Sequence, residues 1–316
     1  MSAPSRLARA QVEKLRTGSD CLHFANRLLK ANKVAHGQGF SNEQEESLTL
    51  MGKATGLAWE KLPSCFERAL RTVEKAKFLQ LLEQRIFDRI PTAYLVGEAW
   101  LGGLRFHVDP RVIIPRSYFV ELIPEVIPQW LPKISAVKHV ADVCTGSGCL
   151  AILLAKQFPR AKVEATDLSA DALAVAALNV KEHKLQTRIK LHRTDTMSAL
   201  LGGPKFDLII SNPPYEPEGI YQKLPAEFKR EPKQSLVSGK DGLDVIRKLL
   251  TQAKELLNPQ GVLVIEVGGL RTAMEKAWPK MPMTWLSTAD GLDCVVLLRA
   301  SELTPPTKPL PRPRRR

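Results

Sequence analysis

The amino-acid sequence predicts an α/β protein, in which a doubly wound, mostly parallel sheet follows a smaller helical domain. Three observations support this prediction. Residues 1–95 have the apolar spacing of helices, whereas short apolar runs alternate with helical segments from about residue 137 onward. Between these regions the glycine pair at 102–103 lies between two runs of aromatic and β-branched residues, which indicates a hairpin.

Two segments are expected before the sheet. Residues 1–95 form a helical domain, in which Phe78, Leu82 and Ile86 repeat at helical spacing. This domain contains no catalytic constellation, so we expect it to recognise the substrate. Residues 96–116 follow as a β-hairpin connector.

The sheet domain is expected over residues 117–302. Its clearest helix covers 241–257, where apolar residues step by three and four. Strands and helices alternate without a repeat, which predicts a doubly wound, mostly parallel sheet. In such a sheet, ligands bind at the carboxyl ends of the strands. The expected strands are 137–143, 161–167, 189–194, 206–211, 261–267 and 293–299.

A glycine turn follows the first strand, in the run Asp-Val-Cys-Thr-Gly-Ser-Gly-Cys. Gly146 and Gly148 lack a Cβ, so the backbone can pass close to a ligand. The dinucleotide fingerprint needs a third glycine where Ala151 stands, which favours a loop around a nucleoside over a pyrophosphate cradle. A tight structural turn is the alternative. The candidate cofactor-binding residues of this run are Asp142, Thr145, Gly146, Ser147, Gly148 and Cys149.

Acidic residues end the next two strands. Asp167 lies about 20 residues beyond the glycine turn, where a carboxylate can accept hydrogen bonds from both ribose hydroxyls. Capping the next helix is its alternative role, although Ser169 and Asp171 can also do that. Asp195 ends the third strand, and its carboxylate is a candidate acceptor for an adenine amino group or a cap of the following helix.

The fourth strand runs directly into Asn212-Pro213-Pro214-Tyr215. Asn212 offers a carbonyl acceptor and an amide donor. The two prolines stiffen the backbone and remove N–H groups, which leaves the carbonyls of Asn212 and Pro213 free to accept hydrogen bonds. Tyr215 supplies a flat face for stacking. Together these four residues predict a clamp for a planar amine or amide, whereas a plain turn would need only one proline.

The glycine turn, the acidic strand end and the Asn-Pro-Pro-Tyr clamp together resemble the S-adenosylmethionine-dependent methyltransferases that modify planar nitrogens. Two flanking segments, PTAYLVGEAWLGGLRFHVDPRVIIPRS before the sheet and EPKQSLVSGKDGLD after the clamp, are similar to the HemK-type protein glutamine methyltransferases. This resemblance covers roughly residues 20–300.

Two branches of that family differ in their substrate. LPAEFKREP (224–232) and VAHGQGFSNEQEE (34–46) are similar to the branch that modifies the third protein of the large ribosomal subunit. The release-factor branch usually has Arg-Pro-x-Thr-Glu where this chain has Arg-Ser-Tyr-Phe-Val-Glu. Two departures are Arg230, where the ribosomal branch usually has histidine, and Thr196, where release-factor enzymes tend to carry an aromatic residue.

The resemblance implies a Rossmann-like methyltransferase sheet that transfers a methyl group from S-adenosylmethionine to the side-chain amide nitrogen (N5) of a glutamine. It implies no metal, and it makes the clamp catalytic. Carbonyls of Asn212 and Pro213 would hold the two amide N–H groups and turn the nitrogen lone pair toward the methyl group. The implied catalytic residues are Asn212, Pro213, Pro214 and Tyr215, and Asn212 joins the cofactor-binding set with Asp167 and Asp195.

The net charge and the composition of the chain indicate which kinds of partner it could bind. The net charge of +13 suggests an anionic partner such as nucleic acid or a ribonucleoprotein, or simply a basic soluble protein. With the resemblance, this suggests a ribosomal protein substrate within an assembling large subunit. The basic tail at 303–316 is expected to be disordered. Absence of a long apolar run predicts no membrane contact, and five cysteines without metal-ligand spacing are expected to be buried thiols in a reducing cytoplasm.

The sequence is also compatible with three alternative functions. A release-factor glutamine methyltransferase would use the same chemistry on another protein. A nucleic-acid adenine-amino methyltransferase would use a similar clamp and would suit the basic charge, although no nucleic-acid-reading module is visible in the sequence. A non-catalytic RNA-binding ribosome-assembly factor would also suit the charge, but it would not need an intact clamp.

Overall fold

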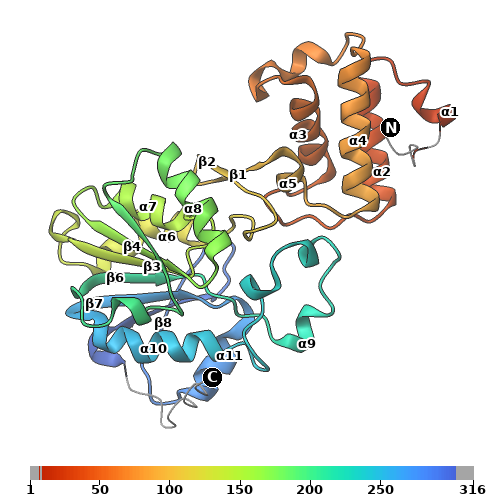
Figure 1. The fold of residues 1–316 in the computed structure, drawn as a ribbon. Helices are drawn as coiled ribbons and strands as arrows, with labels where there is room; N and C mark the ends of the chain where they lie inside the picture. Colours follow the sequence, from red (N-terminus) through yellow and green to blue (C-terminus); the bar gives the residue numbers. More distant parts are fainter. Residues whose placement is uncertain (1–6, 8, 304–316) are drawn as a thin grey trace.

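The computed structural model describes residue 7 and residues 9–303. Helices α1 to α5 form a bundle beside the sheet, and the β1–β2 hairpin lies between bundle and sheet (Figure 1). No helix in this described part is long and apolar enough to cross a membrane. The basic tail expected at 303–316 lies outside the described residues except for Leu303.

The N-terminal bundle has its own apolar core. Phe78, Leu82 and Ile86 are all buried on one side of α4, which confirms the helical spacing expected for them. Thr17 and Asp20 form a capping box at the start of α2, and Asn42 caps α3 by accepting from the Glu45 amide. The helices are α1 (Arg9–Val12), α2 (Gly18–Ala31), α3 (Glu43–Thr55), α4 (Thr72–Phe87) and α5 (Thr92–Val96).

The hairpin predicted around the glycine pair is present. Strands β1 (Glu98–Leu101) and β2 (Leu104–His107) pair antiparallel. Gly102 and Gly103 both adopt positive φ, +57° and +72°, which suits the twist of a two-residue hairpin turn. Buried Asn179 fastens this hairpin to the sheet domain, because its amide pairs with the His107 backbone and donates to the Ser147 carbonyl at 2.8 Å.

The sheet has seven strands in the order β5-β4-β3-β6-β7-β9-β8. The strands from β5 to β7 are parallel, and β9 pairs antiparallel with both β7 and β8, so the prediction of a mostly parallel sheet is confirmed. Short β8 was not predicted. The strands are β3 (His139–Val143), β4 (Lys162–Asp167), β5 (Ile189–Arg193), β6 (Phe206–Ser211), β7 (Leu257–Glu266), β8 (Thr284–Leu286) and β9 (Val295–Arg299).

Helices cover both faces of the sheet (Figure 1). Alternate strand residues enter two separate cores: Val140 and Leu208 pack with α6 and α7, whereas Ala141 and Ile209 pack with α10. The α-helices of this region are α6 (Phe119–Glu125), α7 (Cys149–Gln157), α8 (Ala170–Glu182), α9 (Glu218–Tyr221), α10 (Asp244–Leu256) and α11 (Arg271–Ala277). Short 3₁₀ helices are Trp59–Cys65, Ile127–Trp130, Ile134–Ala136, Ser198–Leu200, Phe228–Arg230, Lys233–Ser235, Gly268–Leu270 and Ala300–Glu302.

The strand order reverses between β3 and β6. From β3 the chain proceeds outward to β4 and β5, then returns to the other side of β3 as β6. Loops that leave β3 and β6 therefore diverge to opposite faces of the sheet, which opens a crevice at their carboxyl ends. The glycine turn follows β3 and the Asn-Pro-Pro-Tyr run follows β6, so the fold brings the two motifs to the same crevice.

Candidate active site

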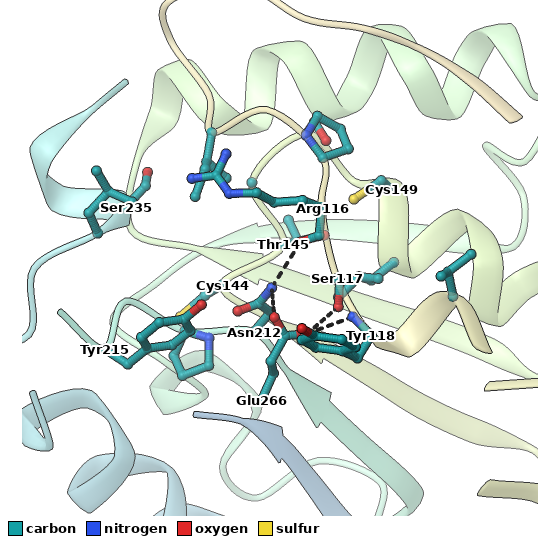
Figure 2. A pocket seen from close by; sticks show the side chains of 18 of the residues that line it. Arg116, Ser117, Tyr118, Cys144, Thr145, Cys149, Asn212, Tyr215, Ser235 and Glu266 are labelled. Carbon is teal, nitrogen blue, oxygen red and sulfur yellow. Dashed lines mark hydrogen bonds between the residues drawn. The ribbon is translucent and has the colours of Figure 1, made fainter. Parts of the chain in front are cut away.

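A cavity of about 600 Å³ lies at the carboxyl ends of β3, β6 and β7. Figure 2 shows Asn212, Tyr215, Thr145 and Glu266 around it. The predicted site residues that line this cavity are Thr145, Gly146, Ser147, Cys149, Asn212, Pro213 and Tyr215. Those outside its lining are Asp142, Gly148, Asp167, Asp195 and Pro214.

The side chain of Asn212 is held in one orientation. Its Nδ2 donates to Oε1 of Glu266 at 3.1 Å and to the Arg116 carbonyl at 3.3 Å (Figure 2). A flipped amide would place its oxygen against two acceptors, so the contacts assign nitrogen to this side. Oδ1 is therefore the amide atom left to accept a hydrogen bond from a ligand.

Glu266 is a site residue that the sequence reasoning missed. It ends β7 and accepts from Ser117 Oγ at 2.5 Å and from the Tyr118 amide at 3.1 Å, in addition to Asn212. Burial raises the pKa of Glu266 to about 7, while these donors pull that pKa back toward its ordinary value. The signal for it was a carboxylate at the end of the apolar run 261–267, next to the strand that carries the clamp.

Two glycines clear space for Tyr215. A Cβ on Gly268 would lie 2.6 Å from the tyrosine ring, and a Cβ on Gly242 would lie 2.3 Å from its carbonyl oxygen. Both glycines adopt positive φ, +52° and +81°. Burial also raises the pKa of the Tyr215 phenol, so this side chain is neutral near pH 7.

A glycine turn follows β3 as expected, and one of its glycines packs against a helix. Gly146 and Gly148 adopt φ of +54° and +80°. A Cβ on Gly148 would lie 3.1 Å from the Cβ of Ala176 on α8, so this position also serves close packing of α8 against the turn. Gly146 faces the cavity, where a Cβ would meet only Ile113 at 3.6 Å.

Asp142 lies beneath the turn and is fully buried. Its Oδ2 accepts from Thr145 Oγ1 at 2.5 Å and from the Ala151 amide at 2.9 Å, which joins the turn to the start of α7. Its Oδ1 has no hydrogen-bond partner within the described residues. Burial raises the pKa of Asp142 to about 7.

Asp167 and Asp195 have different surroundings. Asp167 accepts from the Gly146 amide and the Ser169 amide, each at 2.9 Å, and burial raises its pKa. Ser169 caps α8 itself, by accepting from the backbone of that helix, so Asp167 is not needed as a cap. Asp195 is half exposed and forms an ion pair with Lys248 at 2.6 Å. Its contact with adenine stays a prediction.

The remaining thiols and carboxylates form no metal site in the part of the chain that the structure describes. All five cysteines are free. Cys144 is only partly buried and lines the cavity, whereas Cys21, Cys65, Cys149 and Cys294 are buried.

The fold is that of a methyltransferase, and a family model described as Methyltransferase small domain matches residues 125–275. The ribosomal protein uL3 glutamine methyltransferase of Bordetella pertussis is 40% identical over 291 residues, which cover 92% of this chain and 97% of that protein. The protein of the same name from Bradyrhizobium diazoefficiens is 39% identical and covers 95% of this chain and 96% of its own length. The chain belongs to the family of ribosomal protein uL3 glutamine methyltransferases.

Among solved structures, the catalytic domain of hMettl16 in complex with MAT2A 3'UTR hairpin 1 aligns with a TM-score of 0.50. It covers 87% of this chain and 99% of that chain at 14% sequence identity. This likeness concerns the fold alone.

Proposed function

We propose that this protein transfers a methyl group from S-adenosylmethionine to the N5 nitrogen of a glutamine side chain in ribosomal protein uL3. The observation that carries the proposal is the fixed orientation of Asn212, whose Oδ1 is left to accept from a substrate amide. Family membership supports the substrate, because the curated relatives are named for that reaction.

The clamp suits an amide nucleophile. An amide nitrogen is a poor nucleophile because its lone pair is delocalised into the carbonyl. Asn212 Oδ1 and the Pro213 carbonyl would accept from its two N–H groups and direct the nitrogen lone pair toward the methyl group. Such positioning can contribute on the order of 7–11 kcal/mol in well-oriented intramolecular models. Tyr215 would stack on the amide plane.

Proton transfer needs no strong base in this scheme. As the new nitrogen–carbon bond forms, the sulfur–carbon bond of the sulfonium breaks and the sulfur retains its electron pair. The N-methylated amide cation is very acidic and gives one proton to water. Because the sulfonium charge disperses during transfer, partial burial of the clamp favours the reaction.

S-adenosylmethionine, when bound, supplies the electrophilic methyl group. The glycine turn fits a nucleoside because Gly146 presents bare backbone to the cavity, and Asp167 keeps lone pairs beyond those that accept the two amides. Asp167→Ala should weaken binding of S-adenosylmethionine by about 1.5–3 kcal/mol, the range for a hydrogen bond to a charged group. Calorimetry on a folded variant measures this, and unchanged affinity would remove Asp167 from the cofactor site.

The direct experiment is methylation of purified uL3. The enzyme and labelled S-adenosylmethionine are incubated with uL3, a release factor or total RNA in separate reactions, followed by peptide mass spectrometry. We expect one methyl group on a uL3 glutamine. Transfer to the release factor alone, or to adenine in RNA alone, would replace uL3 as the substrate, and no transfer in any reaction would favour a non-catalytic binding role. A ribosomal substrate, free or within an assembling large subunit, is consistent with action in the cytoplasm.

A further inference from the structure

Residues 224–231, here called the wall segment, form one side of the candidate active site. Leu224 and Phe228 of this segment line the cavity. Its two glutamates, Glu227 and Glu231, are only 2% and 3% exposed. Buried carboxylates require strong partners, and the partners of these two come from different parts of the molecule.

Glu231 is held from the sheet side. Arg116 donates to its two carboxylate oxygens at 2.7 and 2.8 Å, and the Ile114 amide donates at 3.0 Å. The Arg116 guanidinium also lies over the Phe228 ring, 5.4 Å from its centre. This end of the wall segment therefore belongs to the catalytic region.

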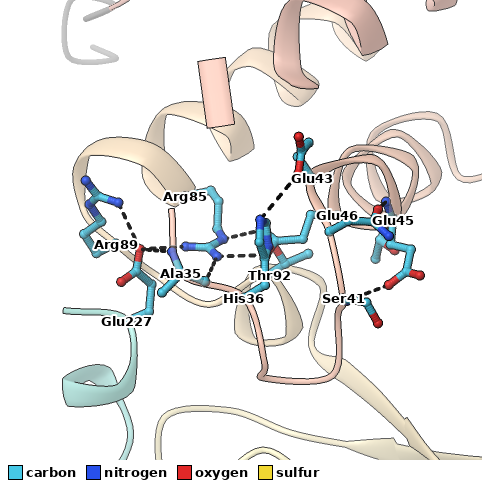
Figure 3. A network of polar contacts seen from close by, with 12 residues as sticks. Ala35, His36, Ser41, Glu43, Glu45, Glu46, Arg85, Arg89, Thr92 and Glu227 are labelled. Carbon is cyan, nitrogen blue, oxygen red and sulfur yellow. Dashed lines mark hydrogen bonds and ion pairs between the residues drawn. The ribbon is translucent and has the colours of Figure 1, made fainter. Parts of the chain in front are cut away.

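Glu227 is held from the N-terminal bundle. Oε1 of this carboxylate accepts from Arg89 Nη1 at 3.0 Å, from the Ala35 amide at 3.2 Å and from Arg85 Nη1 at 3.4 Å (Figure 3). Arg85 is itself buried against Glu46, at 2.5 and 2.8 Å. The bundle thus reaches the active-site wall through a buried charge network.

Arg89 occupies a backbone position that favours another residue. It directly follows Asp88, the C-terminal cap of α4, and adopts φ of +55°. Glycine or asparagine is preferred in this left-handed conformation. The arginine side chain offsets the strain by binding Glu227 and by donating to the Asn32 carbonyl at 2.9 Å.

We propose that Arg89 and Glu227 are a positioning pair, through which the N-terminal bundle holds the wall segment in place for the protein substrate. The inference rests on the proposed function. It adds to that function two residues that do not line the cavity themselves. A loosened wall would misplace the substrate glutamine relative to the clamp. The cofactor side of the cavity, formed by the glycine turn, makes none of these contacts.

Arg89→Gly separates this role from a purely structural one. The change removes the side chain and places the favoured residue at a positive φ, so relief of backbone strain offsets part of the stability lost with the ion pair, and the melting temperature should fall only slightly. The affinity for S-adenosylmethionine should be unchanged, whereas kcat/KM for uL3 should fall about tenfold, as expected when a hydrogen bond to a charged group is lost. Amide hydrogen exchange in residues 224–231 should accelerate, a readout that needs no activity.

Lys184→Gly is the matched control. Lys184 is exposed, follows the cap of α8 and adopts φ of +57°, but it lies outside the charge network. This variant should keep wild-type kcat/KM and wild-type exchange in the wall segment. Glu227→Gln is a second variant, of nearly the same size, and should repeat the Arg89→Gly phenotype.

Unchanged exchange at 224–231 together with unchanged kcat/KM in Arg89→Gly would overturn the proposal, as would an equal loss of S-adenosylmethionine affinity. If wild-type protein failed to methylate uL3, the proposed function would fail instead. Exchange in the wall segment would then still decide whether Arg89 and Glu227 anchor it.

Discussion

Glu266 accepts a hydrogen bond from the side-chain amide of Asn212, and its carboxyl group gains or loses a proton near neutral pH. Its pKa in the folded protein is about 7, above its ordinary value of 4.5. Between these two values the folded state holds a proton that the unfolded chain has lost. The free energy of unfolding therefore falls as pH rises from about 4.5 to about 7, and it levels off above that range.

Glu266→Gln should remove this part of the pH dependence. Urea unfolding between pH 5 and pH 8 should show a shallower decline for the variant than for wild type, and the slope that remains would include the contribution of Asp142, whose pKa is also about 7. In wild type, methyl transfer should increase over the same window, because an ionised Glu266 is the better acceptor for Asn212. If the free energy of unfolding had the same pH dependence in both proteins, the pKa of Glu266 would lie outside this pH range.

The Asn-Pro-Pro-Tyr motif is visible in the sequence, but the contacts that support its asparagine are not. Asn212, Pro213 and Tyr215 are adjacent in the chain, so their chemistry is visible as a motif. The contact between Asn212 and Glu266 depends on strand register, which pairs Ser211 with Ile265. That pairing joins positions more than fifty residues apart and follows from tertiary packing.

At the scale of elements, the apolar runs predicted six strands, and all six are present with small differences at their ends. Strand β8 was missed because it has only three residues, Thr284–Leu286, and exists through its pairing with β9. Short edge strands of this kind have too few residues for alternation to be recognised. The Gly148 packing contact was likewise invisible, because it depends on where α8 crosses the turn.

Gly268, in the turn after β7, allows the position of the Tyr215 ring to be tested. Gly268→Ala should cost about 1–2 kcal/mol of stability from its left-handed backbone. Its new Cβ would also push the Tyr215 ring, so methyl transfer should fall at least about tenfold, as expected for a small misplacement in the site. Gly202→Ala is the control, because Gly202 has φ of +79° and no atom near its added Cβ. Equal kinetics in the two variants would mean that the Tyr215 position is unimportant.

For the whole molecule, sequence patterns predicted a helical region and a sheet but not how they meet. The bundle and the wall segment are joined by Arg85, Arg89 and Glu227, charged residues that in a sequence resemble any solvated surface. Only the fold shows that these groups are buried together. The boundaries expected at residues 95, 116 and 302 remain predictions.

The net charge of +13 leads to a prediction about the substrate. If the enzyme acts on uL3 within a ribonucleoprotein, kcat/KM on particles should fall with added salt more steeply than on free uL3, because each phosphate contact contributes about 0.9 to the logarithmic salt slope. Removing residues 305–316, which carry Lys308, Arg312 and Arg314–Arg316, should reduce that difference. Equal salt slopes on particles and free protein would argue against nucleic-acid contact.

In the proposed mechanism, Asn212 orients a glutamine amide for methyl transfer. Single-turnover rates on purified uL3, with saturating S-adenosylmethionine, test it most directly. Asn212→Ala should lower the rate about a hundredfold or more, the loss typical of a preorganised polar group at a reacting centre, with cofactor affinity nearly intact. Tyr215→Phe should be milder because its stacking face remains. A wild-type rate in Asn212→Ala would show that Asn212 does not orient the amide, and it would reduce the Asn-Pro-Pro-Tyr run to a structural turn.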